Sequence, residues 1–121
     1  MDRMARSVLV VDDSAPFRAT ARAPRAARGY RVVGTAADGG EAIAAVAALR
    51  PDAVLLDINL PDVDGMAVAG RLSGAGGPTV VLVSTLDGAA MRSAIERSGA
   101  RGFLAKADLT SPQLVELLGP P

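Results

Sequence analysis

Two aspartates stand side by side at positions 12 and 13, directly after the apolar run Val-Leu-Val-Val at 8–11. Like charges this close repel each other, so the pair costs free energy unless a cation lies beside it. A structural explanation covers one of them, because Asp13 or Ser14 could cap a following helix. It leaves the other aspartate without a role. The pair therefore indicates a site for a cation at the end of this run.

Chemically capable side chains also end three later apolar runs. Asp57 closes one run, Ser84 and Thr85 close the next, and Lys106 closes the last. Each has an ordinary structural alternative: the aspartate could cap a loop, the serine could bond to the backbone, and the lysine could be a solvated strand end. If these side chains meet at one edge of the fold, a purely structural explanation requires every one of these separate alternatives to be true at that edge. The arrangement of the surrounding elements decides whether they meet.

Apolar runs and helical segments alternate along the chain. Runs rich in Val, Leu and Ile predict strands at 7–12, 30–36, 52–58, 79–84 and 101–106. Helices are predicted at 15–28, 38–49, 64–73, 88–98 and 112–118. Asp38 with Glu41 resembles a capping box, and Ser111 is the expected cap of the last helix. Pro24 falls inside the first predicted helix and should kink it or end it early, because proline removes a backbone hydrogen bond.

This alternation predicts an α/β fold with one parallel sheet and helices on both faces. In such open sheets ligands bind beyond the carboxyl ends of the strands. Asp12, Asp13, Asp57, Ser84 and Lys106 would all lie at that edge. The sequence therefore predicts one polar site there, with three carboxylates and a single lysine.

Composition excludes several classes of function. The chain has 121 residues, which suits one domain with a real core, and Lys plus Arg equals Asp plus Glu at 13 each. Zero net charge gives no general attraction to nucleic acid or to an anionic membrane. The absence of cysteine and histidine excludes disulfide scaffolds, thiolate or imidazole metal sites and the Ser-His-Asp triad. With no long apolar run and no signal-peptide core, a cytoplasmic location is the default expectation.

The ordered set of motifs resembles the receiver domain of two-component response regulators, the CheY-like superfamily. The matching stretches are VVDDS around Asp12, LLDINLPDVDG around Asp57, VLVST around Ser84 and GFLAK ending at Lys106. The resemblance covers nearly the whole chain and implies a single domain over 1–121, with a core at about 7–118 and flexible ends at 1–6 and 119–121. It implies a flavodoxin-like, doubly wound (βα)5 fold with a five-stranded parallel sheet of strand order 2-1-3-4-5.

The resemblance also implies roles for the site residues. Asp57 would be the phosphoacceptor, and the cofactor would be Mg²⁺. Asp13, Asp57 and the backbone carbonyl of Asn59 would ligate the metal directly, and Asp12 would hold a metal-bound water. Lys106 would pair with Asp57 and then with the phosphoryl group. Such a protein is not an enzyme beyond its own phosphorylation and dephosphorylation.

Signalling in this family implies a switch near the site. Ser84 would move to bond the phosphoryl group, and Phe103 would turn inward, although core packing explains Phe103 equally well. The surface of the fourth helix, fifth strand and fifth helix would then change for an output domain or partner, or for a phosphorylation-dependent homodimer. A sensor histidine kinase or phosphotransfer protein would supply the phosphoryl group. Thr85 and Leu86 should exclude water and Asn59 should orient it, which predicts a lifetime of minutes or longer.

Two other classes of protein remain as alternatives. One is an aspartate-nucleophile phosphatase of the haloacid dehalogenase type, which would want a carboxylate where Asn59 stands. The other is a receiver-like binding module that signals without phosphate, which normally lacks one of the acidic residues or the lysine. The stretch after Lys106 resembles that of receivers tethered to DNA-binding domains, a weak indication of transcription regulation.

Overall fold

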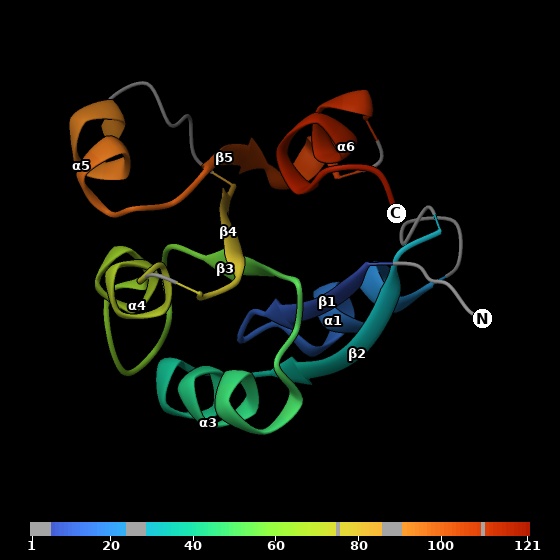
Figure 1. Cartoon of the computed structure of the whole chain (residues 1–121), viewed down its shortest axis with the longest axis horizontal. Coiled ribbons are helices and arrows are strands. Elements are labelled where there is room, and N and C mark those ends of the chain that lie inside the picture. The colour runs from blue at the N-terminus through green and yellow to red at the C-terminus, as the bar shows by residue number, and fades with distance from the viewer. Residues whose placement is uncertain (1–5, 24–28, 75, 86–90, 110) are drawn as a thin grey trace.

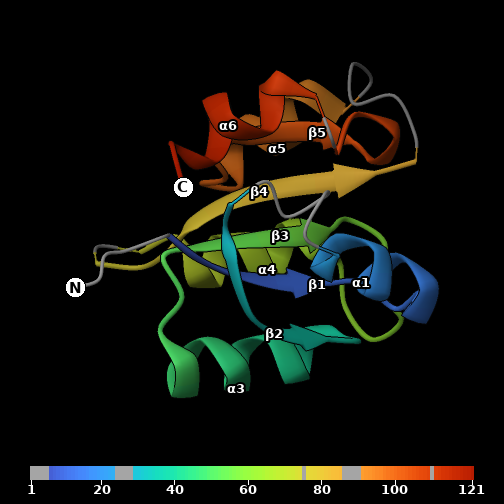
Figure 2. The same ribbon diagram turned by 90° about the vertical axis from the view of Figure 1, so that its right-hand side faces the viewer.

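The computed structural model describes residues 6–23, 29–74, 76–85, 91–109 and 111–121. Its centre is a five-stranded sheet in the order β2-β1-β3-β4-β5, in which every neighbouring pair is parallel. The strands are β1 (Ser7–Val11), β2 (Arg31–Ala36), β3 (Ala53–Asp57), β4 (Thr79–Ser84) and β5 (Gly102–Ala105). They run side by side in one direction (Figure 2), which confirms the predicted fold class and strand order.

Helices cover both faces of the sheet (Figure 1). They are α1 (Ala15–Arg22), α3 (Gly39–Leu49), α4 (Gly65–Leu72), α5 (Arg92–Arg97) and α6 (Pro112–Leu118), with a short 3-10 helix η2 (Lys106–Asp108) after β5. Side chains of α1 and α6 pack into one hydrophobic cluster, and those of α3, α4 and α5 pack into the other. Within the described residues, no helix combines the length and the apolar character that crossing a membrane requires.

The central strands form because their aliphatic side chains find an apolar layer on both faces. Every residue of β1 and of β3 is buried. Side chains alternate between faces along a strand, so Val8 and Val10 lie in the cluster under α1 and α6, while Leu9 and Val11 lie in the other. The edge strand β2 is only partly buried. The two clusters fix the register of the sheet and thereby the height at which each strand ends.

Short polar side chains begin the helices. Ser14 caps α1 by accepting the Phe17 N–H at 3.3 Å, which resolves the choice between Asp13 and Ser14. Asp38 accepts the Glu41 N–H at 2.8 Å, and the predicted cap Ser111 accepts the Gln113 N–H at 3.3 Å. These caps start α1, α3 and α6 close to where the sequence predicts.

Two boundaries differ from the predictions, and the start of a third predicted element lies outside the described residues. The first helix was expected over 15–28, but α1 ends at Arg22, and Ala23 is extended with ψ of 141°. A residue before proline is disfavoured in the helical region, so the early end agrees with the predicted effect of Pro24, which itself lies outside the described residues. The helix predicted at 88–98 is described only as α5 from Arg92, because 86–90 lie outside the description. Lys106, expected on the last strand, begins η2 instead.

Candidate functional site

The carboxyl ends of the strands bring the acidic residues together. Asp12 follows β1, Asp57 ends β3, and Asp13 comes next to Asp12 on the loop toward α1. One carboxylate oxygen from each of these three residues lies within 4.8 Å of the others. Asp12 and Asp57 are buried, whereas Asp13 is exposed. We call Asp12, Asp13 and Asp57 the acidic pocket.

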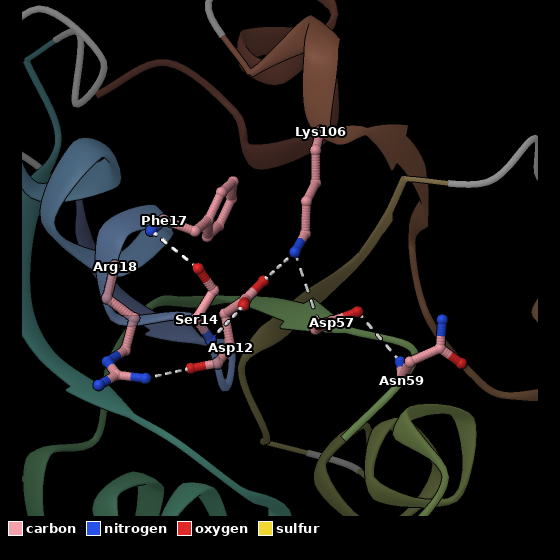
Figure 3. A network of polar contacts seen from close by, with 7 residues as sticks. All are labelled: Asp12, Ser14, Phe17, Arg18, Asp57, Asn59 and Lys106. Carbon is pink, nitrogen blue, oxygen red and sulfur yellow. Dashed lines mark hydrogen bonds and ion pairs between the residues drawn. The ribbon is translucent and has the colours of Figure 1, made fainter. Parts of the chain in front are cut away.

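Asp12 is the most constrained member of the acidic pocket. Its side chain is fully buried, and its Oδ1 accepts the Ser14 N–H at 2.8 Å. Its Oδ2 lies 2.6 Å from the Nζ of Lys106 (Figure 3). A guanidinium nitrogen of Arg18 donates to the main-chain carbonyl of Asp12 at 2.6 Å. The first turn of α1 and the lysine therefore hold this aspartate in one orientation.

Asp57 is held less tightly. Its Oδ1 accepts the Asn59 N–H at 3.0 Å, and its Oδ2 lies 3.6 Å from the Nζ of Lys106. Burial raises the pKa of Asp57 and the negative charge of Asp12 adds to this, while the Asn59 N–H and Lys106 act in the opposite direction. The net shift is upward. The surroundings of Asp57 therefore disfavour its negative charge, and an additional cation would stabilise it.

Lys106 was predicted to pair with Asp57, but its closer partner is Asp12. The lysine side chain extends from the start of η2 down between the two carboxylates (Figure 3). Burial lowers the pKa of Lys106, but the hydrogen bond and charge of Asp12 together with the charge of Asp57 outweigh burial, so the net shift is upward. Lys106 is thus a charged ammonium that partly neutralises both buried carboxylates.

Two residues of α1 contribute to the site although the sequence analysis did not select them. The Nζ of Lys106 lies 4.5 Å from the centre of the Phe17 ring, within the range of a cation–π contact. Arg18 supports Asp12 from the other side. A positional signal existed, because a helix that starts directly after Asp12 places its first turn against the same edge of the sheet. Residue type alone did not distinguish them from ordinary helix residues.

The loop from β3 to α4 lies directly beside Asp57. Its two ends approach each other: Asn59 and Asp64 form an isolated antiparallel bridge, and the Gly65 N–H donates to the Ile58 carbonyl at 2.8 Å. A Cβ on Gly65 would lie 2.2 Å from the carbonyl oxygen of Asp57. Only glycine permits this approach, and it keeps Asn59 next to the phosphoacceptor candidate.

The other predicted site residues differ in burial and in their position along the strands. Ser84 is fully buried at the end of β4, one position beyond Val83, the register partner of Asp57. Thr85 follows it and is exposed. Phe103 is half-buried in β5 and packs against the cluster under α3, α4 and α5. This position agrees with the core-packing explanation of Phe103. Leu86 lies outside the described residues.

The donor set of the acidic pocket suits a hard divalent cation. It offers carboxylate oxygens from three aspartates, and the chain has no cysteine or histidine to add a thiolate or imidazole ligand. Mg²⁺ prefers oxygen ligands and retains several waters, which fits a pocket with one exposed member, Asp13. Burial and the charge of Asp12 raise the pKa of Asp57 although Lys106 acts against them, so an added cation would stabilise the charged carboxylate.

Comparison with known proteins agrees with this geometry. The family model described as "Response regulator receiver domain" matches residues 8–118. The chain is 38% identical over 104 residues to the response regulator MprA of Mycobacterium tuberculosis, which covers 85% of this chain and 45% of MprA. It is 47% identical over 81 residues to a protein-glutamate methylesterase/protein-glutamine glutaminase of Anaeromyxobacter dehalogenans, covering 66% of this chain and 24% of that protein.

Solved structures show the same fold. The signal receiver domain of NarL from Mycobacterium tuberculosis superposes with a TM-score of 0.81 at 32% identity, covering 97% of this chain and 99% of that one. The response regulator domain of Thermotoga maritima CheB gives 0.77 at 30% identity, with 93% and 92% covered. The chain spans less than half the length of the curated relatives named above. With its fold, its acidic pocket and its lysine, the chain belongs to the response regulator receiver domains, which are non-catalytic apart from their own phosphorylation.

Proposed function

We propose that Asp57 accepts a phosphoryl group from a sensor histidine kinase or a phosphotransfer protein, with Mg²⁺ bound at the acidic pocket. The observation that carries this proposal is the position of Asp57. Its carboxylate ends a central strand, is buried beside Asp12, and lies 3.6 Å from the ammonium of Lys106. A nucleophilic carboxylate needs such positive charge, because the incoming phosphoryl group is itself anionic.

The phosphoryl transfer proceeds by displacement at phosphorus. A carboxylate oxygen of Asp57 forms the new bond to phosphorus, the bond to the donor breaks, and the donor leaves with its electron pair. Bound Mg²⁺ would neutralise charge on the transferring group. Asp13, Asp57 and the carbonyl of Asn59 would ligate this ion directly, and Asp12 would act through a water.

Lys106 and Ser84 stabilise the product. The flexible side chain of Lys106 already lies between Asp12 and Asp57, so a small movement brings its ammonium from the first carboxylate to a phosphoryl oxygen. Ser84 ends β4 one residue beyond the register partner of Asp57, and its hydroxyl donates to a second phosphoryl oxygen after a local movement.

The switch transmits this change to the surface of α5, β5 and α6. Movement at Ser84 frees space for Phe103, which lies on the adjacent strand two positions before Ala105, the register partner of Ser84. Phe103 then turns further inward, which shifts the balance between two states of that surface. An output domain, a separate protein or a second phosphorylated copy reads the change. The stretch after Lys106 resembles that of receivers tethered to DNA-binding domains, so an output in transcription belongs to this proposal as well.

Incubation with a small-molecule phosphodonor and Mg²⁺ tests the proposal. We expect one acid-labile phosphoryl group per chain by intact mass, absent in Asp57→Asn and absent when the metal is chelated. Repeated turnover of the donor with release of phosphate would instead support a phosphatase. No reaction and no Mg²⁺ binding would support a phosphate-independent binding module and overturn the proposal.

A further inference from the structure

The carboxylate of Asp62 contacts a helix far from it in the sequence. Its Oδ1 accepts the Gly39 N–H at 2.8 Å, and its Oδ2 accepts the Gly40 N–H at 3.0 Å. These two glycines begin α3, and the cap Asp38 takes the next N–H, that of Glu41. The first N–H groups of a helix have no partner within it. Here the β3–α4 loop supplies the partner for two of them.

Packing at the start of α3 brings the same loop very close. A Cβ on Gly39 would lie 2.4 Å from Cγ2 of Val63 and 3.1 Å from Cγ2 of Val68. A Cβ on Gly40 would meet nothing closer than 3.6 Å. The loop therefore lies directly against Gly39 and leaves room at Gly40. Neither glycine has a positive φ, so space rather than backbone conformation distinguishes them.

This loop also carries Asn59. The Asn59 N–H donates to Asp57 Oδ1, and Asn59 pairs with Asp64 across the base of the loop. The base is fastened at Gly65, and the tip is fastened to α3 through Asp62. Only a few residues separate the tip from Asn59, and the loop is closed at its base by the pairing of Asn59 with Asp64. A shift of the tip would therefore move Asn59. The main chain of Asn59 borders the acidic pocket, so its placement matters for any ion held there.

We infer that Asp62 and Gly39 position the β3–α4 loop so that the Asn59 carbonyl is held ready for Mg²⁺. We call the contact of Asp62 and Val63 with Gly39 and Gly40 the loop clamp. The inference rests on the proposed function and deepens it, because it names a positioning element outside the ligand set. The positive end of α3 stabilises the Asp62 carboxylate. In agreement, the N–H groups of Gly39 and Gly40 lower the pKa of Asp62.

Two pairs of variants test the loop clamp. Asp62→Ala removes the hydrogen bonds, and its control Asp38→Ala removes one carboxylate from the same helix start while leaving the loop contact intact. Gly39→Ala forces Val63 away, and its control Gly40→Ala adds the same methyl group where there is room and retains the N–H. We expect Asp62→Ala and Gly39→Ala to weaken Mg²⁺ binding about tenfold by calorimetry, at the lower end of what outer-shell partners contribute. The controls should bind like the wild type.

A second readout needs no metal. In the metal-free protein, the Asn59 amide resonance should shift, and its hydrogen exchange should accelerate, in Asp62→Ala and Gly39→Ala but not in Asp38→Ala or Gly40→Ala. Asp62→Asn retains one acceptor oxygen and should fall between Asp62→Ala and the wild type. If the wild type binds Mg²⁺ and accepts phosphate while all four alanine variants match it, the loop clamp is wrong and the proposed function stands. If the wild type binds no Mg²⁺, both are overturned.

Discussion

Two aspartates at opposite ends of β3 have opposite environments. Asp52 directly precedes the strand and is exposed, and its Oδ2 accepts the Ser7 N–H at 2.8 Å and the Ser7 hydroxyl at 3.2 Å. Asp57 ends the strand, is buried, and has Asp12 as a neighbour. The Ser7 N–H lowers the pKa of Asp52, helped by the charges of Arg6 and Arg31, whereas burial and Asp12 raise the pKa of Asp57.

The difference separates a carboxylate whose hydrogen bonds are satisfied within the structure from one whose buried charge is only partly offset. Asp52 and Ser7 satisfy each other, because the Ser7 hydroxyl also accepts the Asp52 N–H at 2.9 Å. This closed pair joins β1 to β3 at their amino ends and leaves no need for a ligand. Asp57 stands in a group with more negative than positive charge. Such unbalanced charge in a folded protein indicates a site that binds or reacts.

The largest expected effect comes from the same substitution at the two ends of the strand. Asp57→Asn should abolish phosphate incorporation and raise the melting temperature of the metal-free protein, because its surroundings disfavour the charge that is removed. Asp52→Asn should leave incorporation unchanged and destabilise the protein by about 1 kcal/mol, since weaker hydrogen bonds replace charged ones at an exposed site. Intact mass and thermal unfolding measure both. Equal shifts of the melting temperature in the same direction would contradict the comparison.

The sequence predicted most of the fold and the composition of the site, for identifiable reasons. Continuous aliphatic runs fixed β1, β3 and β4, and a parallel sheet places their carboxyl ends together, so Asp12 and Asp57 could be assigned to one site. Whether Lys106 lies closer to Asp12 or to Asp57 depends on how far its side chain extends from the end of β5 toward the end of β1. The contact of Asp62 with α3 joins segments 22 and 23 residues apart and leaves no local pattern. Both require the packed structure.

Lys106 provides the next comparison. Its positive charge offsets negative charge at the Asp57 end of β3 and not at the Asp52 end. Lys106→Met should destabilise the metal-free protein by about 2 kcal/mol, below the usual cost of breaking a buried ion pair because this side chain is 19% exposed. Added Mg²⁺ should restore part of the loss. Lys106→Arg keeps the charge and should lose less stability. Urea unfolding with and without Mg²⁺ measures these effects, and an unchanged stability in Lys106→Met would show that the ammonium does not compensate Asp12 and Asp57.

The pH dependence of stability should distinguish the two aspartates by sign. Asp52, with a folded pKa below its usual 3.8, contributes stability that is present above that value and is lost as pH falls through the folded pKa. Asp57, with a folded pKa above 3.8, has the opposite effect: stability falls as pH rises from 3.8 through its folded pKa. In urea unfolding of the metal-free protein, Asp52→Asn should therefore lose less stability in acid than the wild type, with part of the loss remaining because the pKa of Asp62 is also lowered. Asp57→Asn should lose the decline of stability above pH 3.8. The reverse assignment would contradict the two environments.

The smallest expected effect concerns the exposed rim of the acidic pocket. Hydrolysis of the acyl phosphate requires a water in line behind the phosphorus, opposite the Asp57 oxygen that leaves. Thr85 is exposed directly after Ser84, and we expect its bulk to narrow the approach of that water. Thr85→Ala should shorten the phosphoprotein lifetime about two- to threefold by enlarging this approach, a change well below 1 kcal/mol in the barrier. Thr85→Val keeps the bulk without the hydroxyl and should decay like the wild type. Decay is followed by intact mass in excess Mg²⁺. A faster decay in Thr85→Val than in Thr85→Ala would assign the effect to the hydroxyl, and equal decay in all three proteins would show that this rim does not control access of water.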